Sequence, residues 1–166
     1  MLKGLKSLFG SKEKHVIVSP MAGKAIPMSQ VNDPTFSQEI LGKGVAIIPS
    51  EGEVKAPVNG TVSMIFDTKH AVSMTADNGA EIIIHIGLDT VELKGEHFTA
   101  LAEAGQKVTA GTPLVRFDME KIKEAGYDVA TILAVTDDKA HYYPDAAFFI
   151  TKLIADRKTH QLLGMQ

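Results

Sequence analysis

Between residues 15 and about 118, the chain consists of short apolar runs rich in Val, Ile, Thr and Phe. Gly, Pro, Asn or Asp interrupts these runs roughly every eight to twelve residues, and apolar residues at helical spacing are scarce. This spacing is typical of antiparallel strands joined by tight turns. The pattern therefore predicts an all-β fold, a compact antiparallel β-sandwich or barrel-sandwich with repeated hairpin corners.

Two stretches share the pattern small-Pro-x-x-Gly-x-apolar, residues 19–25 and 56–62, and they predict two similar corners. Residues 105–114 carry a Gly-x-x-Val-x-x-Gly-x-x-Leu pattern, which is typical of a strand that folds back on itself. Residues 33–41 and 118–126 interrupt the strand texture with sequences that favour single helical turns. We expect these turns to be local additions to the sandwich.

The two ends of the chain depart from this pattern. Residues 1–14 hold four lysines and one glutamate among leucines at near-helical spacing, so they predict a flexible tail able to touch an anionic membrane surface. Near the other end, "ATILAVTDD" (130–138) reads as a strand, whereas "AAFFITKLIADRK" (146–158) fits either a strand or a helix. We expect one domain over residues 15–166, with an atypical C-terminal segment at 137–166.

Composition excludes several classes of protein. The net charge of −3 becomes more negative outside the lysine-rich start, so the chain lacks the basic surface that nucleic-acid binding requires. No apolar run approaches the roughly 18 to 20 residues of a membrane span. Cysteine is absent, which excludes disulfides and thiolate zinc sites, and no signal peptide is visible at the start. We expect a cytoplasmic protein.

A histidine stands inside the most apolar strand, "EIIIHIGLDT" (81–90). Because side chains alternate along a strand, Ile83, His85, Gly87 and Asp89 are expected on one face. Gly87 has no side chain, so it leaves space beside the histidine for another group.

A second histidine, His70, is predicted to join the first through a hairpin. The strand at 67–76 is followed by Asp77-Asn78-Gly79, a strong turn signal. A two-residue loop at 77–78 or at 78–79 puts His70 on the His85 face, with Cβ atoms about 5 to 8 Å apart.

Two imidazoles on an apolar surface cost desolvation free energy, so they need a structural partner or a chemical role. A serine triad is disfavoured, because no Gly-x-Ser-x-Gly elbow is present and Ser73 is expected on the face opposite to His70. Zinc is one alternative, with His70, His85 and Asp89 as three ligands and one open position. Phosphoryl transfer is another: one ring nitrogen attacks phosphorus, while the second histidine and Thr68 hydrogen-bond the transferred oxygens. The residues alone leave both alternatives open.

The stretch Gly79 to Val91, "GAEIIIHIGLDTV", resembles the phosphorylation-site signature of a known family. That family is the glucose-class IIA component of the bacterial phosphoenolpyruvate-dependent sugar phosphotransferase system. The resemblance extends through residues 19–52, 56–72 and 91–98, so it covers roughly residues 15 to 136. The family's usual final Gly-x-Val-x-x-Gly strand is not recognisable here, which leaves the closing strand open.

The resemblance implies that His85 carries the phosphoryl group on Nε2, that His70 supports transfer, and that Thr68 belongs to the histidines' hydrogen-bond network. It implies a β-sandwich with a shallow apolar depression for docking proteins. The residues expected at this depression are Phe36, Ile40, Leu41, Phe66, Ile83 and Asp89. The phosphocarrier HPr would be the donor, the IIB domain of a sugar permease the acceptor, and no cofactor is required.

Other functions remain as alternatives. The histidine pair would also suit a zinc-binding protein or a regulatory module that binds partners through the same surface. Biotinyl and lipoyl carriers share repeated hairpins, and "FDTKHAV" superficially resembles their lysine motif. Those carriers present the modified lysine at a hairpin tip, whereas the tip here is "DNG", so Lys69 is predicted to be an ordinary solvated lysine.

Overall fold

The computed structural model describes residues 16–40, 42–136, 153–155 and 162–165. The elements in chain order are β1 (Gly23–Pro27), η1 (Met28–Gln30), α1 (Pro34–Ser37), β2 (Lys43–Pro49), β3 (Glu53–Lys55), β4 (Gly60–Ile65), β5 (Ala71–Ala76), β6 (Glu81–Ile86), η2 (Thr90–Leu93), β7 (Phe98–Ala100), β8 (Lys107–Val108), β9 (Pro113–Phe117), α2 (Met119–Glu124), β10 (Thr131–Thr136), β11 (Leu153–Ala155) and β12 (Leu162–Met165). The predictions for residues 1–14, for Leu41 and for most of 137–166 lie outside the described residues.

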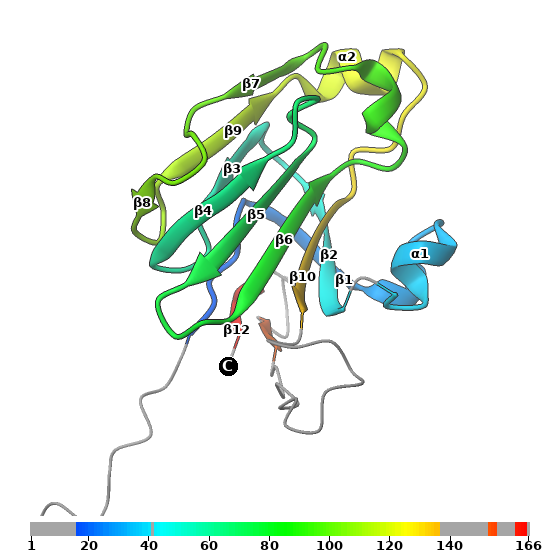
Figure 1. The fold of residues 1–166 in the computed structure, drawn as a ribbon. Helices are drawn as coiled ribbons and strands as arrows, with labels where there is room; N and C mark the ends of the chain where they lie inside the picture. Colours follow the sequence, from blue (N-terminus) through cyan, green and yellow to red (C-terminus); the bar gives the residue numbers. More distant parts are fainter. Residues whose placement is uncertain (1–15, 41, 137–152, 156–161, 166) are drawn as a thin grey trace, which may run out of the picture.

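Two antiparallel sheets form a sandwich, which confirms the predicted fold class. The larger sheet has the order β1-β2-β10-β6-β5-β4-β8, and the smaller sheet, β3-β9-β7, lies across it (Figure 1). Alternate residues of β6, Ile82, Ile84 and Ile86, are at most 1% exposed and point into the main core. The smaller sheet contributes Val54, Leu114 and other side chains to the same core, so burial between the sheets holds the layers together.

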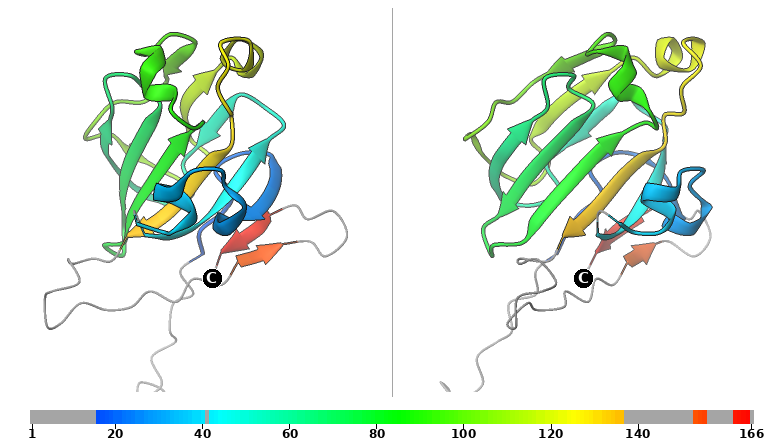
Figure 2. Two further views of the ribbon diagram at one scale, coloured as in Figure 1. Left: turned by 90° about the vertical axis from the view of Figure 1, so that its right-hand side faces the viewer. Right: turned by 45° about the vertical axis from the view of Figure 1, so that its right-hand side comes forward.

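A second, smaller apolar cluster covers the other face of the larger sheet. It contains Met28, Val31, Phe36, Ala46, Leu88, Ile132 and Ala134. The segment with η1 and α1 supplies the first three of these residues, and it lies over the sheet near β10 (Figure 2). The face of β6 that carries His85 therefore borders an apolar cluster that η1 and α1 already cover.

Both predicted helical turns are confirmed, and each begins at an aspartate. Asp33 Oδ1 accepts hydrogen bonds from the backbone nitrogens of Thr35 at 2.8 Å and Phe36 at 3.1 Å. Asp118 Oδ1 accepts from the nitrogen of Lys121 at 3.1 Å. These side chains satisfy amide groups that a helix start leaves without partners.

The two repeated corners lie against each other. In each corner the motif glycine, Gly23 or Gly60, is the first residue of a strand. The corners also exchange backbone hydrogen bonds, because Val18 donates to the Pro57 carbonyl at 2.9 Å and Lys55 donates to the Pro20 carbonyl at 2.7 Å. The internal repeat therefore marks a real structural pairing.

The hairpin between β5 and β6 forms at the predicted turn but in a different register. Ala71, not His70, lies opposite His85, and residues 77–80 connect the two strands. Both predicted registers are therefore wrong. The prediction for Ser73 is wrong as well, because Ser73 pairs with Ile83 and lies on the same face of the sheet as His85. Only the missing Gly-x-Ser-x-Gly motif still argues against a serine triad.

The segment after residue 130 contains strands. The predicted strand is confirmed as β10, an inner strand of the larger sheet that pairs with β2 on one side and β6 on the other. Within the stretch left open between strand and helix, residues 153–155 form β11, which pairs with β12. Among the described residues, no helix has the length and apolar character needed to cross a membrane.

Candidate functional site

His85 has one ring nitrogen engaged by the backbone. The side chain projects from β6, and its Nδ1 lies 2.9 Å from the carbonyl oxygen of Gly87. A carbonyl only accepts hydrogen bonds, so the proton of the neutral ring belongs on Nδ1. The lone pair of Nε2 then remains available for chemistry. Ala71, directly across the ladder, is small and does not cover this ring with a long side chain.

His70 lies beside His85 although it is not part of the regular strand. The centroids of the two rings are 4.8 Å apart and the planes are nearly perpendicular, at 81°. The chain bends just before β5, where Lys69 has φ of 56°, so strand alternation does not set the direction of the His70 side chain. The predicted proximity of the two rings is confirmed, whereas the hairpin arithmetic behind it is not.

Thr68 holds the His70 ring from the side. Its Oγ1 lies 2.5 Å from His70 Nδ1, in agreement with a shared hydrogen-bond network. If the hydroxyl donates to Nδ1, the ring proton is on Nε2, where it can be donated to a bound oxygen. The three residues predicted for chemistry, Thr68, His70 and His85, are thus brought together.

Aromatic rings form the apolar walls of the site. The ring of Phe36 packs 4.9 Å from that of His85, and the ring of Phe66 lies 5.6 Å from that of His70. His70 is 5% exposed and His85 is half-buried, so this histidine pair has limited contact with water. The walls therefore keep the rings in a medium that disfavours charge.

Burial lowers the pKa of His85 to about 4, and repulsion from a protonated His70 acts in the same direction. The Gly87 carbonyl and the carboxylates of Asp33 and Asp89 raise this pKa, but they do not outweigh burial. Burial also lowers the pKa of His70. Both rings are therefore neutral near pH 7, which is the state a nitrogen nucleophile requires.

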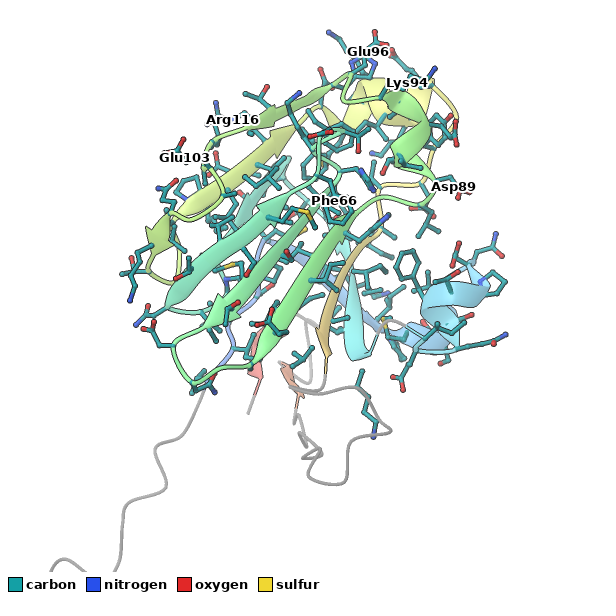
Figure 3. The ribbon with its side chains drawn as sticks, in the orientation of Figure 1. Phe66, Asp89, Lys94, Glu96, Glu103 and Arg116 are labelled. Atoms are coloured by element: carbon teal, nitrogen blue, oxygen red, sulfur yellow. The ribbon has the colours of Figure 1, made fainter. Side chains whose placement is uncertain are left out.

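The residues predicted for docking differ in exposure. Ile40 is 66% exposed and Asp89 is also exposed, while Phe66 and Ile83 are half-buried. Asp89 follows β6, and Phe66 lies between β4 and β5 (Figure 3). The Phe66 ring packs against His70, and the Asp89 carboxylate acts on the pKa of His85, so both residues are near the histidines.

Phe36 corrects one part of the docking prediction. It was expected at a shallow apolar depression, where its ring could anchor a partner, but it is only 6% exposed and belongs to the second apolar cluster. The physical reason is that the Asp33 cap turns α1 onto the larger sheet, where the ring meets His85 and the cluster beneath it. Phe36 is a packed wall of the site and not an exposed anchor.

The zinc prediction also needs correction. Within residues 16–40, 42–136, 153–155 and 162–165, no three His, Asp or Glu side chains come together as metal ligands. His70, His85 and Asp89 therefore do not form the three-ligand zinc site that was one alternative. A zinc site on the histidine pair that a partner's side chain completes stays a prediction.

Comparison with known proteins identifies the family of this chain. The family model for the phosphoenolpyruvate-dependent sugar phosphotransferase system, EIIA 1, matches residues 15–141, which is most of the chain. The chain belongs to this family. As an EIIA protein it is a phosphoryl carrier of the sugar phosphotransferase system, and the alternative of a zinc-binding protein is not supported.

Two relatives agree with the EIIA assignment. Over 128 residues, 77% of this chain, the sequence is 56% identical to the PTS system beta-glucoside-specific EIIBCA component of Bacillus subtilis (strain 168). That match covers 21% of the relative, so the chain spans about a fifth of its length. The glucose permease IIA from Mycoplasma capricolum has the same fold, with a TM-score of 0.74 and 28% identity over 90% of this chain and 94% of that one.

Two features of this EIIA site were not predicted from the sequence. The Gly87 carbonyl fixes the proton of His85, and Asp33 caps the turn that carries Phe36. A cap could have been predicted from Asp33 followed by Pro34, which is a common helix start. The carbonyl contact had no signal in residue types, because it is made by the backbone.

Proposed function

We propose that His85 accepts a phosphoryl group on Nε2 and passes it to the next protein of the sugar phosphotransferase system. The observation that carries this proposal is the hydrogen bond from His85 Nδ1 to the Gly87 carbonyl, which leaves Nε2 with its lone pair. Membership of the EIIA family supports the same reaction. The lowered pKa of His85 supports it further, because the ring stays neutral at the pH of a cell interior.

In this proposal the Nε2 lone pair attacks phosphorus and forms an N–P bond. The bond between phosphorus and the donor's leaving atom breaks, and its electron pair stays on the donor. His70 donates a hydrogen bond from Nε2 to the transferred oxygens, and Thr68 holds that ring through Nδ1. Because the donor is already a phosphoprotein, the step needs no nucleotide-binding loop.

We propose HPr as the donor and the IIB domain of a sugar permease as the acceptor. The Bacillus subtilis relative carries B, C and A components in its name, which supports a IIB partner for this chain. Docking would use the exposed side of the site, with Ile40, Phe66, Ile83 and Asp89 around the histidines. The choice of sugar would then belong to the permease, since the EIIA surface handles only the phosphoryl group and proteins.

A cytoplasmic location belongs to the same proposal. Contact between the lysine-rich tail and a membrane surface stays a prediction, because residues 1–14 lie outside the described residues.

A phosphorylation assay tests the proposed roles. Incubation with phosphoenolpyruvate, the first enzyme of the system and HPr should leave an acid-labile, base-stable phosphate on the wild-type chain. His85→Ala should carry none, because the nucleophile is removed. His70→Gln should still accept phosphate but pass it slowly to IIB, since it loses only a group that stabilises the transferred oxygens.

Single-turnover measurements with labelled phosphate separate these outcomes. A phosphorylated His85→Ala variant would refute the proposed acceptor. Equal loss of acceptance and donation in His70→Gln would show that His70 positions His85 and does not assist transfer.

A further inference from the structure

Thr90 is a fully buried polar residue beside the site, with 0% exposure. Its hydroxyl donates a hydrogen bond to the carbonyl oxygen of Ile86, the residue that follows His85. This bond joins Thr90, at the end of the short loop after β6, to Ile86, at its start. A buried hydroxyl without an acceptor would cost free energy, so breaking this bond is unfavourable. The loop between these ends contains Gly87, whose carbonyl contacts His85.

Gly87 is held tightly from two sides. It has φ of 76°, and a Cβ at this position would lie 2.4 Å from Thr90 Cγ2 and 2.6 Å from the carbonyl oxygen of Asp128. That same carbonyl accepts a hydrogen bond from the nitrogen of Leu88 at 3.0 Å. Thr90 therefore contributes a hydrogen bond to the Ile86 carbonyl, at the start of the loop, and a methyl group close to Gly87. The Asp128 carbonyl holds the Gly87–Leu88 peptide directly through the Leu88 nitrogen.

The direction of the Gly87 carbonyl decides which nitrogen of His85 carries the proton. With the carbonyl 2.9 Å from Nδ1, the proton is on Nδ1 and Nε2 is free. If the peptide turned away, Nδ1 would lose its acceptor and the proton could move to Nε2. The proton would then occupy the nitrogen that must attack phosphorus. A wrong histidine tautomer in a serine protease lowers the rate by up to about 10⁴, which shows how large such an effect can be.

We propose that Thr90 is a positioning residue that keeps His85 in the Nδ1-protonated tautomer by holding the Gly87 carbonyl toward the ring. The proposal rests on the proposed role of His85 Nε2 as the phosphoryl acceptor. Thr90 does not touch the reacting atoms. It acts through the backbone of the loop, and its two contributions, the hydroxyl and the methyl group, can be removed separately.

The test compares Thr90→Val, which keeps the methyl packing but removes the hydroxyl, with Thr90→Ser, which keeps the hydroxyl. The tautomer of His85 is read from the ¹⁵N chemical shifts of its ring in the full-length labelled protein. Wild type and Thr90→Ser should show a protonated Nδ1 and an unprotonated Nε2. Thr90→Val should show averaged shifts, and its single-turnover acceptance from phosphorylated HPr should fall at least about tenfold with little change in HPr affinity.

Thr131→Val is the matched control. Thr131 is also 0% exposed, and its hydroxyl donates to the Val129 carbonyl at 3.2 Å, so its loss removes another buried hydrogen bond. This variant should lose stability but keep the wild-type tautomer and transfer rate. If Thr90→Val keeps the wild-type shifts and rate, or if Thr131→Val changes them equally, the proposal is wrong.

A second pair decides the matter if Thr90→Val does not fold. Thr90→Cys and Thr90→Ser have nearly the same shape, but a thiol is a much weaker hydrogen-bond donor than a hydroxyl. The Cys variant should therefore show less Nδ1 protonation and slower transfer than the Ser variant, and equal behaviour would refute the role of the hydroxyl. The tautomer measurement involves no phosphoryl group, so it stands even if His85→Ala disproves the proposed acceptor.

Discussion

At the scale of single residues, His85 links the chemistry of the site to the stability of the fold. Its pKa is about 4 in the folded protein against 6.5 for an unperturbed histidine, chiefly because the ring is buried. Between these values the unfolded chain binds a proton that the folded chain does not. The free energy of unfolding must therefore fall as the pH falls through this window.

We predict that the wild type loses about 3 kcal/mol of stability between pH 6.5 and pH 4 through His85, since one pKa unit corresponds to about 1.36 kcal/mol. Denaturant unfolding of wild type and His85→Gln across this range measures the effect. Carboxylates titrate in both proteins, so the difference between the two curves isolates the histidine. Parallel curves for the two proteins would show that the ring is not held neutral by burial.

At the scale of elements, α1 connects helix capping to the environment of the histidine. Asp33 caps this turn, and the turn carries Phe36 into contact with the His85 ring. A helix of four residues has little stability of its own, so it depends on this cap and on packing.

Replacing Asp33 by Ala should lower the free energy of unfolding by about 1 kcal/mol, the usual cost of losing an N-cap. It should also change the ring shifts of His85, because Phe36 is no longer held against it and because the Asp33 carboxylate no longer acts on the ring. Asp118→Ala provides the control, since it removes the cap of α2, and no contact described for α2 reaches His70 or His85. Equal changes at His85 in both variants would contradict the link between α1 and the site.

At the scale of the whole molecule, exposed aliphatic side chains mark where a partner can dock. Ile40 is 66% exposed, and it follows α1, which lies beside the histidines. Leu101 is 38% exposed and follows β7, a strand of the smaller sheet on the other side of the core. The two residues therefore test the proposed docking face against a distant face.

Ile40→Glu should weaken HPr binding about tenfold, or about 1.4 kcal/mol, because it places a charge in an apolar contact. Leu101→Glu should leave binding unchanged, and neither substitution should shift stability by more than about 0.5 kcal/mol, as is usual at exposed positions. Calorimetric titration with HPr beside a thermal melt measures both quantities. A docking face elsewhere is indicated if Leu101→Glu weakens binding and Ile40→Glu does not.

Local sequence patterns determined much of this protein. The alternation in "EIIIHI" specified a strand with one buried face, and "DNG" specified the turn that brings His70 toward His85. Asp33 and Asp118 marked the two helical turns. Each of these features depends on residues a few positions apart, because alternation, turn chemistry and capping are short-range effects.

Tertiary structure alone decided the details that set the reactivity of the site. The register at Ala71 and the bend at Lys69 direct the His70 ring, and Phe36 is buried against His85 only because α1 folds back onto the sheet. Around Gly87, Thr90 bonds the Ile86 carbonyl, and the Asp128 carbonyl, from the segment before β10, accepts a hydrogen bond from the Leu88 nitrogen. These contacts join segments far apart in the chain or pass through backbone atoms, so residue types and spacing carry no signal for them.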